Sequence, residues 1–233
     1  MVTNLSKILN DINTFVVPAY CFGCNAVLYR GEHLLCAFCR NELPLTEFNY
    51  GSENAVDRIF YGRCRVDKAG ALLYYREKGM VQRMIHGLKY HGREEIGSYL
   101  GAWYGQQLVR DPGIRTIDYV LPVPLHKRKQ KKRGYNQCRR FGREIARSLN
   151  AAYSERLLVK PVMSHTQTTR DRWSRWSGTR GTFHTPKPEK LAGRRILLVD
   201  DVITTGATME ACAEVLWETG PDRLLIAAMA IVP

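Results

Sequence analysis

From about residue 55 onward, the hydrophobic positions alternate between two patterns. Apolar side chains recur every three or four residues in four segments, which predicts helices, and form short continuous runs in three others, which predicts buried strands. The predicted helices are residues 80–90, 94–109, 136–149 and 207–219, and the predicted strands are residues 118–123, 195–200 and 223–232. Helices that alternate with continuously apolar strands are typical of a parallel sheet covered on both faces. We therefore expect an α/β fold with a doubly wound, mainly parallel sheet.

The first 50 residues follow a different pattern. Residues 1–20 carry apolar side chains at helical spacing, interrupted by polar ones, which predicts an amphipathic helix that ends at Pro18. Residues 21–45 contain paired cysteines and several turn residues instead of a long apolar run. We therefore expect two parts, an N-terminal module over residues 1–50 and a larger α/β domain over residues 51–233.

Four cysteines in the N-terminal module form two C-x₂-C pairs, Cys21 with Cys24 and Cys36 with Cys39, separated by eleven residues. Four thiolates at this spacing are typical of a tetrahedral zinc site, and Gly23 permits the tight turn of the first pair. Because four cysteines fill every coordination position, the zinc is expected to be structural. A segment of this size folds poorly without a metal, so we expect a small zinc ribbon.

The chain of 233 residues has a net charge of +13, from 35 basic and 22 acidic side chains. Residues 1–50 hold three basic and four acidic side chains, so they sum to −1 and the other 183 residues carry +14. This balance favours polyanionic partners such as nucleotides, phosphorylated sugars or nucleic acid, although a basic surface without a specific partner gives the same composition. The absence of a secretory signal and of an apolar run near the roughly 20 residues of a membrane span favours a reducing cytoplasm.

The stretch Ile196 to Thr208 combines a buried strand, two adjacent carboxylates and the start of a helix. Ligands of parallel sheets lie at the carboxyl ends of strands, where Asp200 and Asp201 are expected. Ionised carboxylates suit sugar hydroxyls or a metal shell, whereas the unpaired N–H groups at a helix start suit a phosphate. The turn between them consists of Thr204, Thr205, Gly206, Ala207 and Thr208. One ligand that meets both needs is a ribose 5-phosphate unit.

A dense basic segment follows the predicted strand 118–123. Six of the eight residues from His126 to Arg133 are lysine or arginine. We expect a loop that faces the acidic pair, acting as a mobile lid, as a track for nucleic-acid phosphates, or as both. A solvated charged loop is the alternative. The candidate contacts to pyrophosphate or nucleic acid are Pro124, Leu125, Lys127, Arg128, Lys129, Lys131, Lys132 and Arg133.

The histidines and the remaining cysteines are expected to have modest roles. His86 lies beside apolar neighbours in a predicted helix, which favours packing, whereas His126 and His165 lie near the expected anion site and could contact it. Buried structural thiols, rather than catalytic ones, are expected at Cys64, Cys138 and Cys212.

Arginines and tryptophans are interleaved between residues 170 and 180. Such a pattern suits single-stranded nucleic acid, because bases stack on indole rings while basic groups bind phosphates. Packing of Trp173 and Trp176 in a core explains the two tryptophans equally well.

Together these motifs resemble known families. The stretch Ile196 to Thr208 resembles the phosphoribosyl pyrophosphate (PRPP) signature of type I phosphoribosyltransferases at all 13 positions. The Pro122 to Gln137 segment, the Gly87 to Tyr90 segment, the Thr166 to Trp176 segment and the cysteine knuckle are similar to the ComF family. The resemblance extends from Cys21 to Pro233.

The resemblance implies a type I phosphoribosyltransferase-like fold that binds PRPP, with Asp200 and Asp201 on the ribose hydroxyls and residues 204–208 around the 5-phosphate. It also implies Mg²⁺ bound with the pyrophosphate, in addition to the structural zinc. ComF proteins are associated with DNA uptake in natural competence, so single-stranded DNA and the competence machinery are implied partners. Gly178 stands where the family commonly has asparagine, so no amide contact is expected there.

Two functions remain open on these residues. In one, the chain binds PRPP or a nucleotide without turnover while it handles nucleic acid. In the other, it is an enzyme that transfers ribose 5-phosphate from PRPP to a nucleobase or another small acceptor. The acceptor would be held by residues before 115, whose part in binding the sequence does not reveal.

Overall fold

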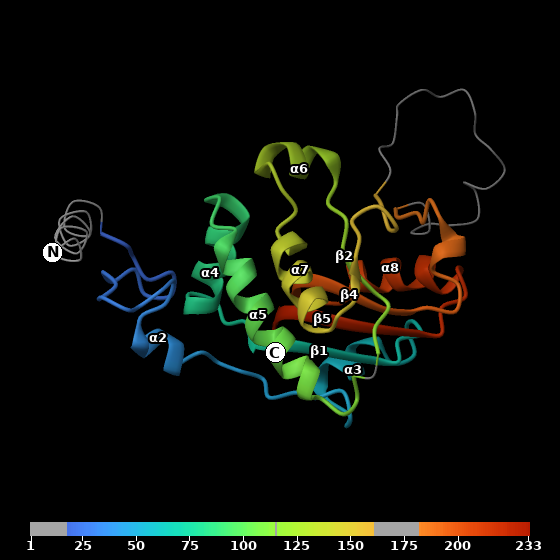
Figure 1. Cartoon of the computed structure of the whole chain (residues 1–233), viewed down its shortest axis with the longest axis horizontal. Coiled ribbons are helices and arrows are strands. Elements are labelled where there is room, and N and C mark those ends of the chain that lie inside the picture. The colour runs from blue at the N-terminus through green and yellow to red at the C-terminus, as the bar shows by residue number, and fades with distance from the viewer. Residues whose placement is uncertain (1–17, 115, 161–181) are drawn as a thin grey trace, which may run out of the picture.

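The computed structural model describes residues 18–114, 116–160 and 182–233 (Figure 1). These residues form a five-stranded sheet in the order β1-β5-β4-β2-β3, and every pairing between neighbouring strands is parallel. The strands are β1 (Lys68–Tyr74), β2 (Tyr119–Pro122), β3 (Ala152–Tyr153), β4 (Arg195–Ile203) and β5 (Arg223–Ile231). The expected α/β fold with a parallel sheet is confirmed, and β4 lies at the centre of the sheet.

Helices cover both faces of the sheet (Figure 1). One face packs against α4, α5 and α7, and the other packs against α3 and α8. The bounds of these helices are Ala55–Phe60 for α3, Met80–Tyr90 for α4, Glu95–Arg110 for α5, Cys138–Ser148 for α7 and Ala207–Trp217 for α8. The four helices predicted from hydrophobic spacing are therefore present, and the sheet is doubly wound as expected. A 3₁₀ turn, η2 (Pro188–Lys190), precedes β4.

Residues of β4 alternate between the two layers of the core. Leu197 and Val199 pack in the cluster that contains α4, α5 and α7, whereas Ile196 and Leu198 pack in the cluster that contains α3 and α8. All four side chains are fully buried. A strand covered on both faces has no polar side, which is why this segment is a continuous apolar run. The same packing directs the next residues, the acidic pair, to the carboxyl edge of the sheet.

Helices α5 and α7 pack very closely. A Cβ atom on Gly101 of α5 would lie 2.6 Å from the carbonyl oxygen of Phe141 on α7, so only glycine permits this approach of the two backbones. The predicted apolar stripe of α5 is buried at every position, namely Ile96, Leu100, Tyr104 and Leu108. This packing fixes α7, whose first residue, Cys138, contacts the acidic pair.

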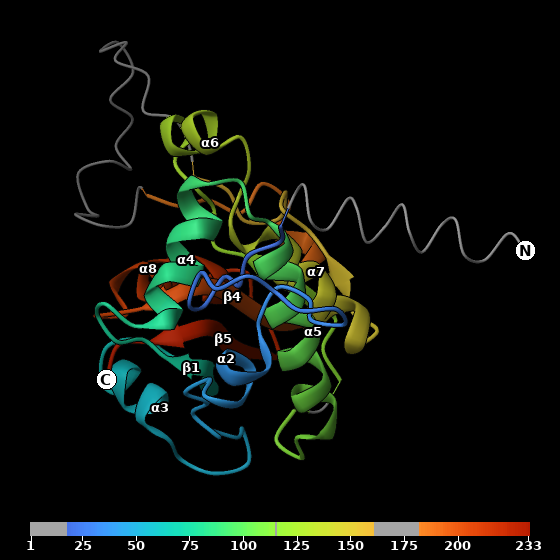
Figure 2. The same cartoon turned by 90° about the vertical axis from the view of Figure 1, so that its left-hand side faces the viewer.

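The N-terminal module lies beside α4 (Figure 2). It consists of two cysteine turns and the short helix α2 (Ala37–Asn41). Arg83 of α4 donates a hydrogen bond from Nε to the carbonyl oxygen of Gly23, and the guanidinium of Arg93 lies 4.6 Å from the ring centroid of Phe22. The module is thus held against the helix that borders the carboxyl edge of the sheet.

The basic segment forms a helix, α6 (Lys127–Arg133), so the expectation of a loop was wrong. Lysine, arginine and glutamine are good helix formers, and the run contains no glycine, proline or β-branched residue. The ring Nδ1 of His126 accepts a hydrogen bond from the N–H of Arg128 at the start of α6, and Gly134 ends it with φ of 81°. Both views show that α6 projects above the sheet (Figures 1 and 2).

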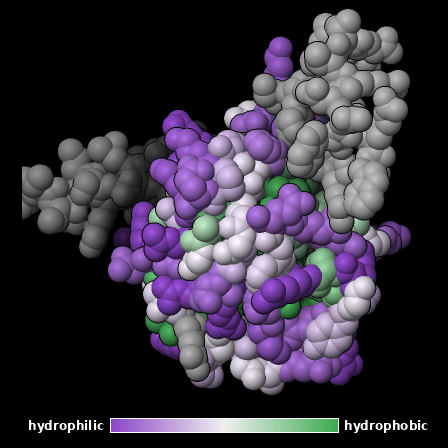
Figure 3. All heavy atoms as spheres, turned by 90° about the vertical axis from the view of Figure 1, so that its right-hand side faces the viewer, coloured by the Kyte–Doolittle hydropathy of each residue, from purple (hydrophilic) through white to green (hydrophobic). Residues whose placement is uncertain are grey.

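Among the described residues, no helix combines the length and apolar character required to span a bilayer. Figure 3 shows the side of the molecule that carries the amino ends of the strands, where the visible described atoms are mostly hydrophilic with small apolar areas between them. Residues 1–17, which contain most of the predicted N-terminal helix, lie outside the described part of the chain.

Candidate functional site

Asp200 and Asp201 lie within β4, close to its carboxyl end. The predicted strand ended at residue 200, but β4 continues to Ile203, so the pair belongs to the strand instead of following it. Asp201 is 5% exposed, and its Oδ1 lies 2.8 Å from Nζ of Lys89 on α4. Its other oxygen, Oδ2, is buried and has no hydrogen-bond partner in the described part of the chain. A buried carboxylate oxygen without a donor is costly, so this atom is ready to accept a hydrogen bond from a ligand.

Asp200 has a more crowded environment. Its Oδ1 accepts hydrogen bonds from the N–H of Asp201, at 2.8 Å, and from the thiol of Cys138, at 3.4 Å. Burial, followed by repulsion from the charge of Asp201, raises the pKa of Asp200 to about 7. The two carboxylates therefore have different neighbours, since Asp201 contacts a lysine counter-ion and Asp200 contacts a neutral thiol.

The turn after β4 has a free helix end. Thr204, Thr205, Ala207 and Thr208 are all exposed. Gly206 has φ of 76°, and a Cβ atom there would lie 2.7 Å from Cγ2 of Ile59, so both the backbone conformation and the available space require glycine. The N–H of Glu210 donates to the carbonyl oxygen of Gly206, so the N–H groups that precede it have no acceptor within α8. This arrangement suits a phosphate.

Arg63 braces this turn from the segment that follows α3. It donates through Nη1 to the carbonyl oxygen of Thr205 and through Nη2 to the carboxylate of Glu210 on α8. It also donates to the carbonyl oxygen of Ile59. The position of the turn therefore depends on a side chain almost 150 residues earlier in the sequence, which the sequence analysis did not identify.

A cavity of about 480 Å³ adjoins the acidic pair. Asp201 and Thr204 line one side of it, and α4 forms the opposite side. This volume lies in the usual range for small-molecule sites. The cavity, the acidic pair and the phosphate turn thus share one edge of the sheet.

Two of the segments that resembled a known family, Gly87 to Tyr90 and Pro122 to Gln137, contact each other here. The hydroxyl of Tyr135 donates to the carbonyl oxygen of Leu88 on α4, and the guanidinium of Arg133 lies 5.2 Å from the ring centroid of Tyr90. The amide of Asn136 donates to the carbonyl oxygen of Val123, 2.9 Å away, in the segment that leaves β2. These contacts join α4, α6 and β2 into one wall beside the acidic pair.

The predicted basic contacts follow the carboxyl end of β2, and most of them lie on α6. Pro124 and Leu125 are partly exposed after β2, and Arg128, Lys129, Lys131 and Lys132 are exposed on α6. Within the described residues, these four cations have no carboxylate within 4 Å. Lys127 is the first residue of α6, and Arg133 donates to Oε1 of Gln137.

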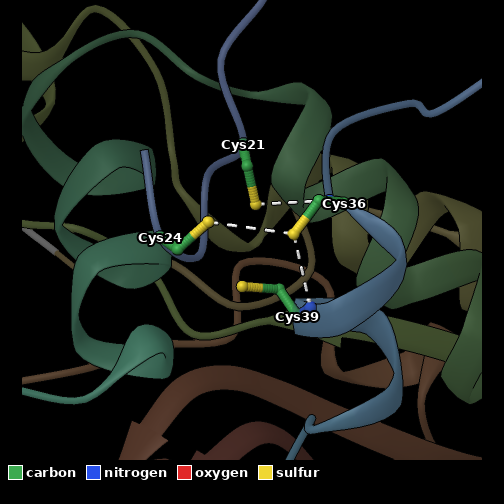
Figure 4. A group of neighbouring side chains, drawn as sticks. All are labelled: Cys21, Cys24, Cys36 and Cys39. Carbon is green, nitrogen blue, oxygen red and sulfur yellow. Dashed lines mark hydrogen bonds between the residues drawn. The ribbon is translucent and has the colours of Figure 1, made fainter. Parts of the chain in front are cut away.

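Four sulfur atoms point toward one another in the N-terminal module (Figure 4). They belong to Cys21, Cys24, Cys36 and Cys39 and lie within 4.8 Å of one another. The sulfurs of Cys24 and Cys36 are 3.8 Å apart, and tetrahedral zinc with bonds of about 2.3 Å requires a separation of about 3.8 Å. The predicted four-cysteine cluster is therefore present, with a geometry that fits zinc.

Backbone N–H groups support the thiolate form of these cysteines. The N–H groups of Gly23 and Cys36 donate to Sγ of Cys21, and that of Cys39 donates to Sγ of Cys36. Burial acts to raise the pKa of Cys21, but its backbone hydrogen bonds outweigh burial and lower it to about 7. In contrast, burial and the neighbouring thiols raise the pKa of Cys39. A bound cation would relieve the crowding of these sulfurs.

The remaining cysteines and His86 differ in how far they are buried. Cys138 and Cys212 are buried as predicted, whereas Cys64 is only partly buried. The prediction that His86 packs in the core was wrong, because its side chain is exposed and its ring lies 4.7 Å from that of Tyr90. The remaining predictions concern His165, Trp173, Trp176 and Gly178, which lie outside the described residues.

Comparison with known proteins agrees with this architecture. The family model described as the phosphoribosyl transferase domain matches residues 136–231. The chain is 29% identical over 216 residues to "DNA utilization protein YhgH" of Escherichia coli strain K12, covering 88% of this chain and 93% of that protein. It is 24% identical over 222 residues to "Competence protein F" of Haemophilus influenzae, covering 90% of this chain and 96% of that protein.

Two solved structures are similar at lower identity. The glutamine PRPP amidotransferase of B. subtilis has a TM-score of 0.44 and 18% identity, and the match covers 62% of this chain and 30% of that chain. A hypoxanthine phosphoribosyltransferase of Staphylococcus aureus has a TM-score of 0.35 and 13% identity, covering 60% of this chain and 75% of that chain.

The parallel sheet, the acidic pair on its central strand and the matched domain define a phosphoribosyltransferase-domain protein. Beyond that domain, the chain is similar over most of its length to proteins named "DNA utilization protein YhgH" and "Competence protein F".

Sequence reasoning missed several site residues. Lys89 is the counter-ion of Asp201, and Cys138 contacts Asp200. Both lie in or beside segments that resembled the family. The sequence motifs therefore marked these positions but did not indicate what the two side chains contact. Arg63 had no such signal, because its contacts depend on how α3 packs against α8.

Proposed function

We propose that this protein binds PRPP, with the ribose hydroxyls at Asp200 and Asp201 and the 5-phosphate in the turn from Thr204 to Thr208. The observation that carries the proposal is the buried, unpartnered Oδ2 of Asp201 beside a helix start with free N–H groups. A ligand that donates a hydroxyl at one end and carries a phosphate at the other satisfies both.

Two metal ions belong to the proposal. Mg²⁺ accompanies the pyrophosphate and is held mainly by ligand oxygens and water, because Mg²⁺ retains waters and relies on substrate phosphates. Zinc is held by Cys21, Cys24, Cys36 and Cys39, whose four sulfurs already lie within 4.8 Å of one another. Because four thiolates fill every coordination position, this zinc has a structural role. A zinc module over residues 1–50 also supports a boundary near residue 50 between that module and the larger domain.

We further propose that the protein handles single-stranded DNA in natural competence. The names of the relatives, "DNA utilization protein" and "Competence protein F", support this role. Support from the structure comes from the exposed cations of α6, which lack acidic partners among the described residues. Reduced thiols in a zinc site fit a cytoplasmic location.

Calorimetry tests the central proposal. PRPP should bind to the wild-type protein in the presence of Mg²⁺ and bind far more weakly without it. The double variant Asp200→Asn with Asp201→Asn should lose binding, whereas Glu144→Gln, an exchange of the same kind on α7, should leave it unchanged. Absence of PRPP binding to the folded wild-type protein would contradict the proposal.

A second candidate function is turnover, with ribose 5-phosphate transferred to a small acceptor. The cavity of about 480 Å³ beside Asp201 and Thr204 favours it, because an acceptor bound there would lie next to the ribose. A screen of nucleobases for release of pyrophosphate from PRPP tests this function. Release that depends on a particular base supports an enzyme, and the absence of release with PRPP bound supports a binding protein.

A further inference from the structure

The outward side of α4 borders two cavities. The first is the cavity of about 480 Å³ that contains Asp201 and Thr204, and the second, of about 660 Å³, lies between α4 and the N-terminal module. Gln82 and His86 line both. The two cavities are therefore neighbours that share one wall, and Figure 1 shows α4 between the module and the sheet.

The wall of the first cavity is aromatic. The rings of His86 and Tyr90 lie 4.7 Å apart, and both line this cavity. Tyr90 is 54% exposed. Tyr75, at the end of β1, adds a third ring, and Gln82 offers an amide that can donate and accept hydrogen bonds. Such a wall suits a planar ring with polar edges, which is the chemistry of a nucleobase.

The second cavity is cationic. It is lined by Arg83, Arg93 and His91 and also by Cys21 of the four-cysteine cluster, and no carboxylate is among its described lining residues. Contacts with the module hold both arginines in place, since Arg83 donates to the carbonyl oxygen of Gly23 and Arg93 lies over Phe22. Fixed guanidinium groups that retain N–H donors are suited to a phosphate.

We propose that the two cavities together bind a nucleotide, with its base against His86 and Tyr90 and its phosphate toward Arg83 and Arg93. The proposal rests on the proposed function, in which PRPP occupies the acidic pair beside the first cavity. The base would then lie next to the bound ribose, and the phosphate would lie under the N-terminal module. The cationic second cavity selects a nucleotide over a free base, because a free base leaves it without an anion.

The shared chemistry of a base and a phosphate can come from a free nucleotide or from the end of a DNA strand. The probes are therefore thymidine, thymidine 5′-monophosphate, and a short oligothymidylate with and without a 5′-phosphate. Calorimetry on the full chain should give binding of the monophosphate at least about tenfold tighter than that of thymidine, since a well-placed charged contact is worth more than 1.4 kcal/mol. The oligonucleotide arms distinguish the sources, because a preference for the 5′-phosphorylated strand over the free monophosphate identifies a strand end.

Two variants separate the two halves of the site. His86→Ala with Tyr90→Ala should weaken binding of the monophosphate about tenfold or more, because it removes the stacking wall. Arg93→Gln should remove the preference for the monophosphate over thymidine. Arg147→Gln, on the exposed side of α7, should change neither. Zinc content of each variant shows whether the N-terminal module is still folded.

Binding of PRPP, measured on the same samples, separates this proposal from the previous one. Retained PRPP binding with no binding of any thymidine probe overturns the nucleotide site alone. Equal affinity for thymidine and its monophosphate overturns the role of the second cavity. If the wild-type protein does not bind PRPP, that result counts against the proposed function instead.

Discussion

The ammonium of Lys89 lies 2.8 Å from Oδ1 of Asp201, and this contact joins α4 to the central strand of the sheet. It leaves Oδ2 of Asp201 as the only oxygen of that carboxylate still without a partner among the described residues. Lys89 therefore does two things. It compensates a buried charge, and it occupies one carboxylate oxygen so that only the other is left to accept a further hydrogen bond.

Replacing Lys89 should leave Asp201 as an uncompensated buried charge. We expect Lys89→Met to lower the free energy of unfolding by about 1–3 kcal/mol, below the full cost of a wholly buried pair because the lysine is partly exposed. Lys89→Arg should recover much of this loss. Urea denaturation at pH 7 measures the free energy of unfolding of both variants. An unchanged unfolding midpoint in Lys89→Met would show that the contact does not contribute to stability.

The acidic pair should make stability depend on pH. The pKa of Asp200 is about 7 in the folded protein and about 3.9 in an unfolded chain, so the unfolded state loses its proton first as pH rises. Stability therefore falls between about pH 4 and pH 7, and the penalty is complete above pH 7. Asp200→Asn should be more stable than the wild type by on the order of 1–3 kcal/mol at pH 8, with the difference vanishing near pH 4. Thermal unfolding across this range tests it, and a difference independent of pH would contradict it.

The turn after β4 should tolerate no side chain at residue 206. In Gly206→Ala, the φ of 76° and the contact with Ile59 both act against the methyl group, so we expect a loss of about 2–4 kcal/mol and of PRPP binding. Gly193→Ala is the matched control, because Gly193 has φ of 65° but open space around it. Its cost should be about 1 kcal/mol with PRPP binding intact. Similar losses in both variants would mean that crowding at residue 206 is unimportant.

Metal analysis should give one zinc per chain. Four thiols should be protected from alkylation until a chelator is added, after which the N-terminal module should lose its structure. Cys39→Ser should abolish zinc retention, because it removes one of four ligands, whereas Cys64→Ser should retain it. Two disulfides in the purified protein, with no zinc, would rule out the metal site.

Binding of single-stranded DNA should depend on the exposed face of α6. Replacing Arg128, Lys129, Lys131 and Lys132 by glutamine should reduce the salt slope of log K by up to about 3, at about 0.7 per phosphate contact. Glutamine at Arg58 and Arg147, two exposed arginines on other helices, serves as the control. An unaltered slope in the α6 variant would place the DNA elsewhere on the protein.

The sequence was most informative where local chemistry determines structure. The period of apolar residues predicted α5 because its stripe is buried in the core at every position, and the run Ile196 to Val199 predicted a buried strand because both of its sides are covered. The acidic pair and the glycine turn could be recognised equally well. A strand followed by two carboxylates and by a glycine before a helix is typical of a ligand site at the carboxyl end of a strand. Cysteine spacing predicted the cluster of four sulfur atoms for the same reason.

What could not be predicted depends on contacts between distant segments. Lys89 is one of many lysines until α4 packs beside β4. His86 was expected to pack because its neighbours in sequence are apolar, but its side chain is exposed. The basic segment was expected to be a loop because of its density of charge, although lysine and arginine have high helix propensity. Tertiary packing decided the role of Lys89, whereas α6 follows from a local propensity that the sequence analysis did not weigh.

A structure of the protein with PRPP and Mg²⁺ tests the central claim most directly. The account predicts a ribose hydroxyl within hydrogen-bond distance of Oδ2 of Asp201, with the 5-phosphate on the backbone N–H groups of Ala207 and Thr208. A bound ligand that leaves this oxygen without a donor, or that lies away from the turn after β4, would contradict it.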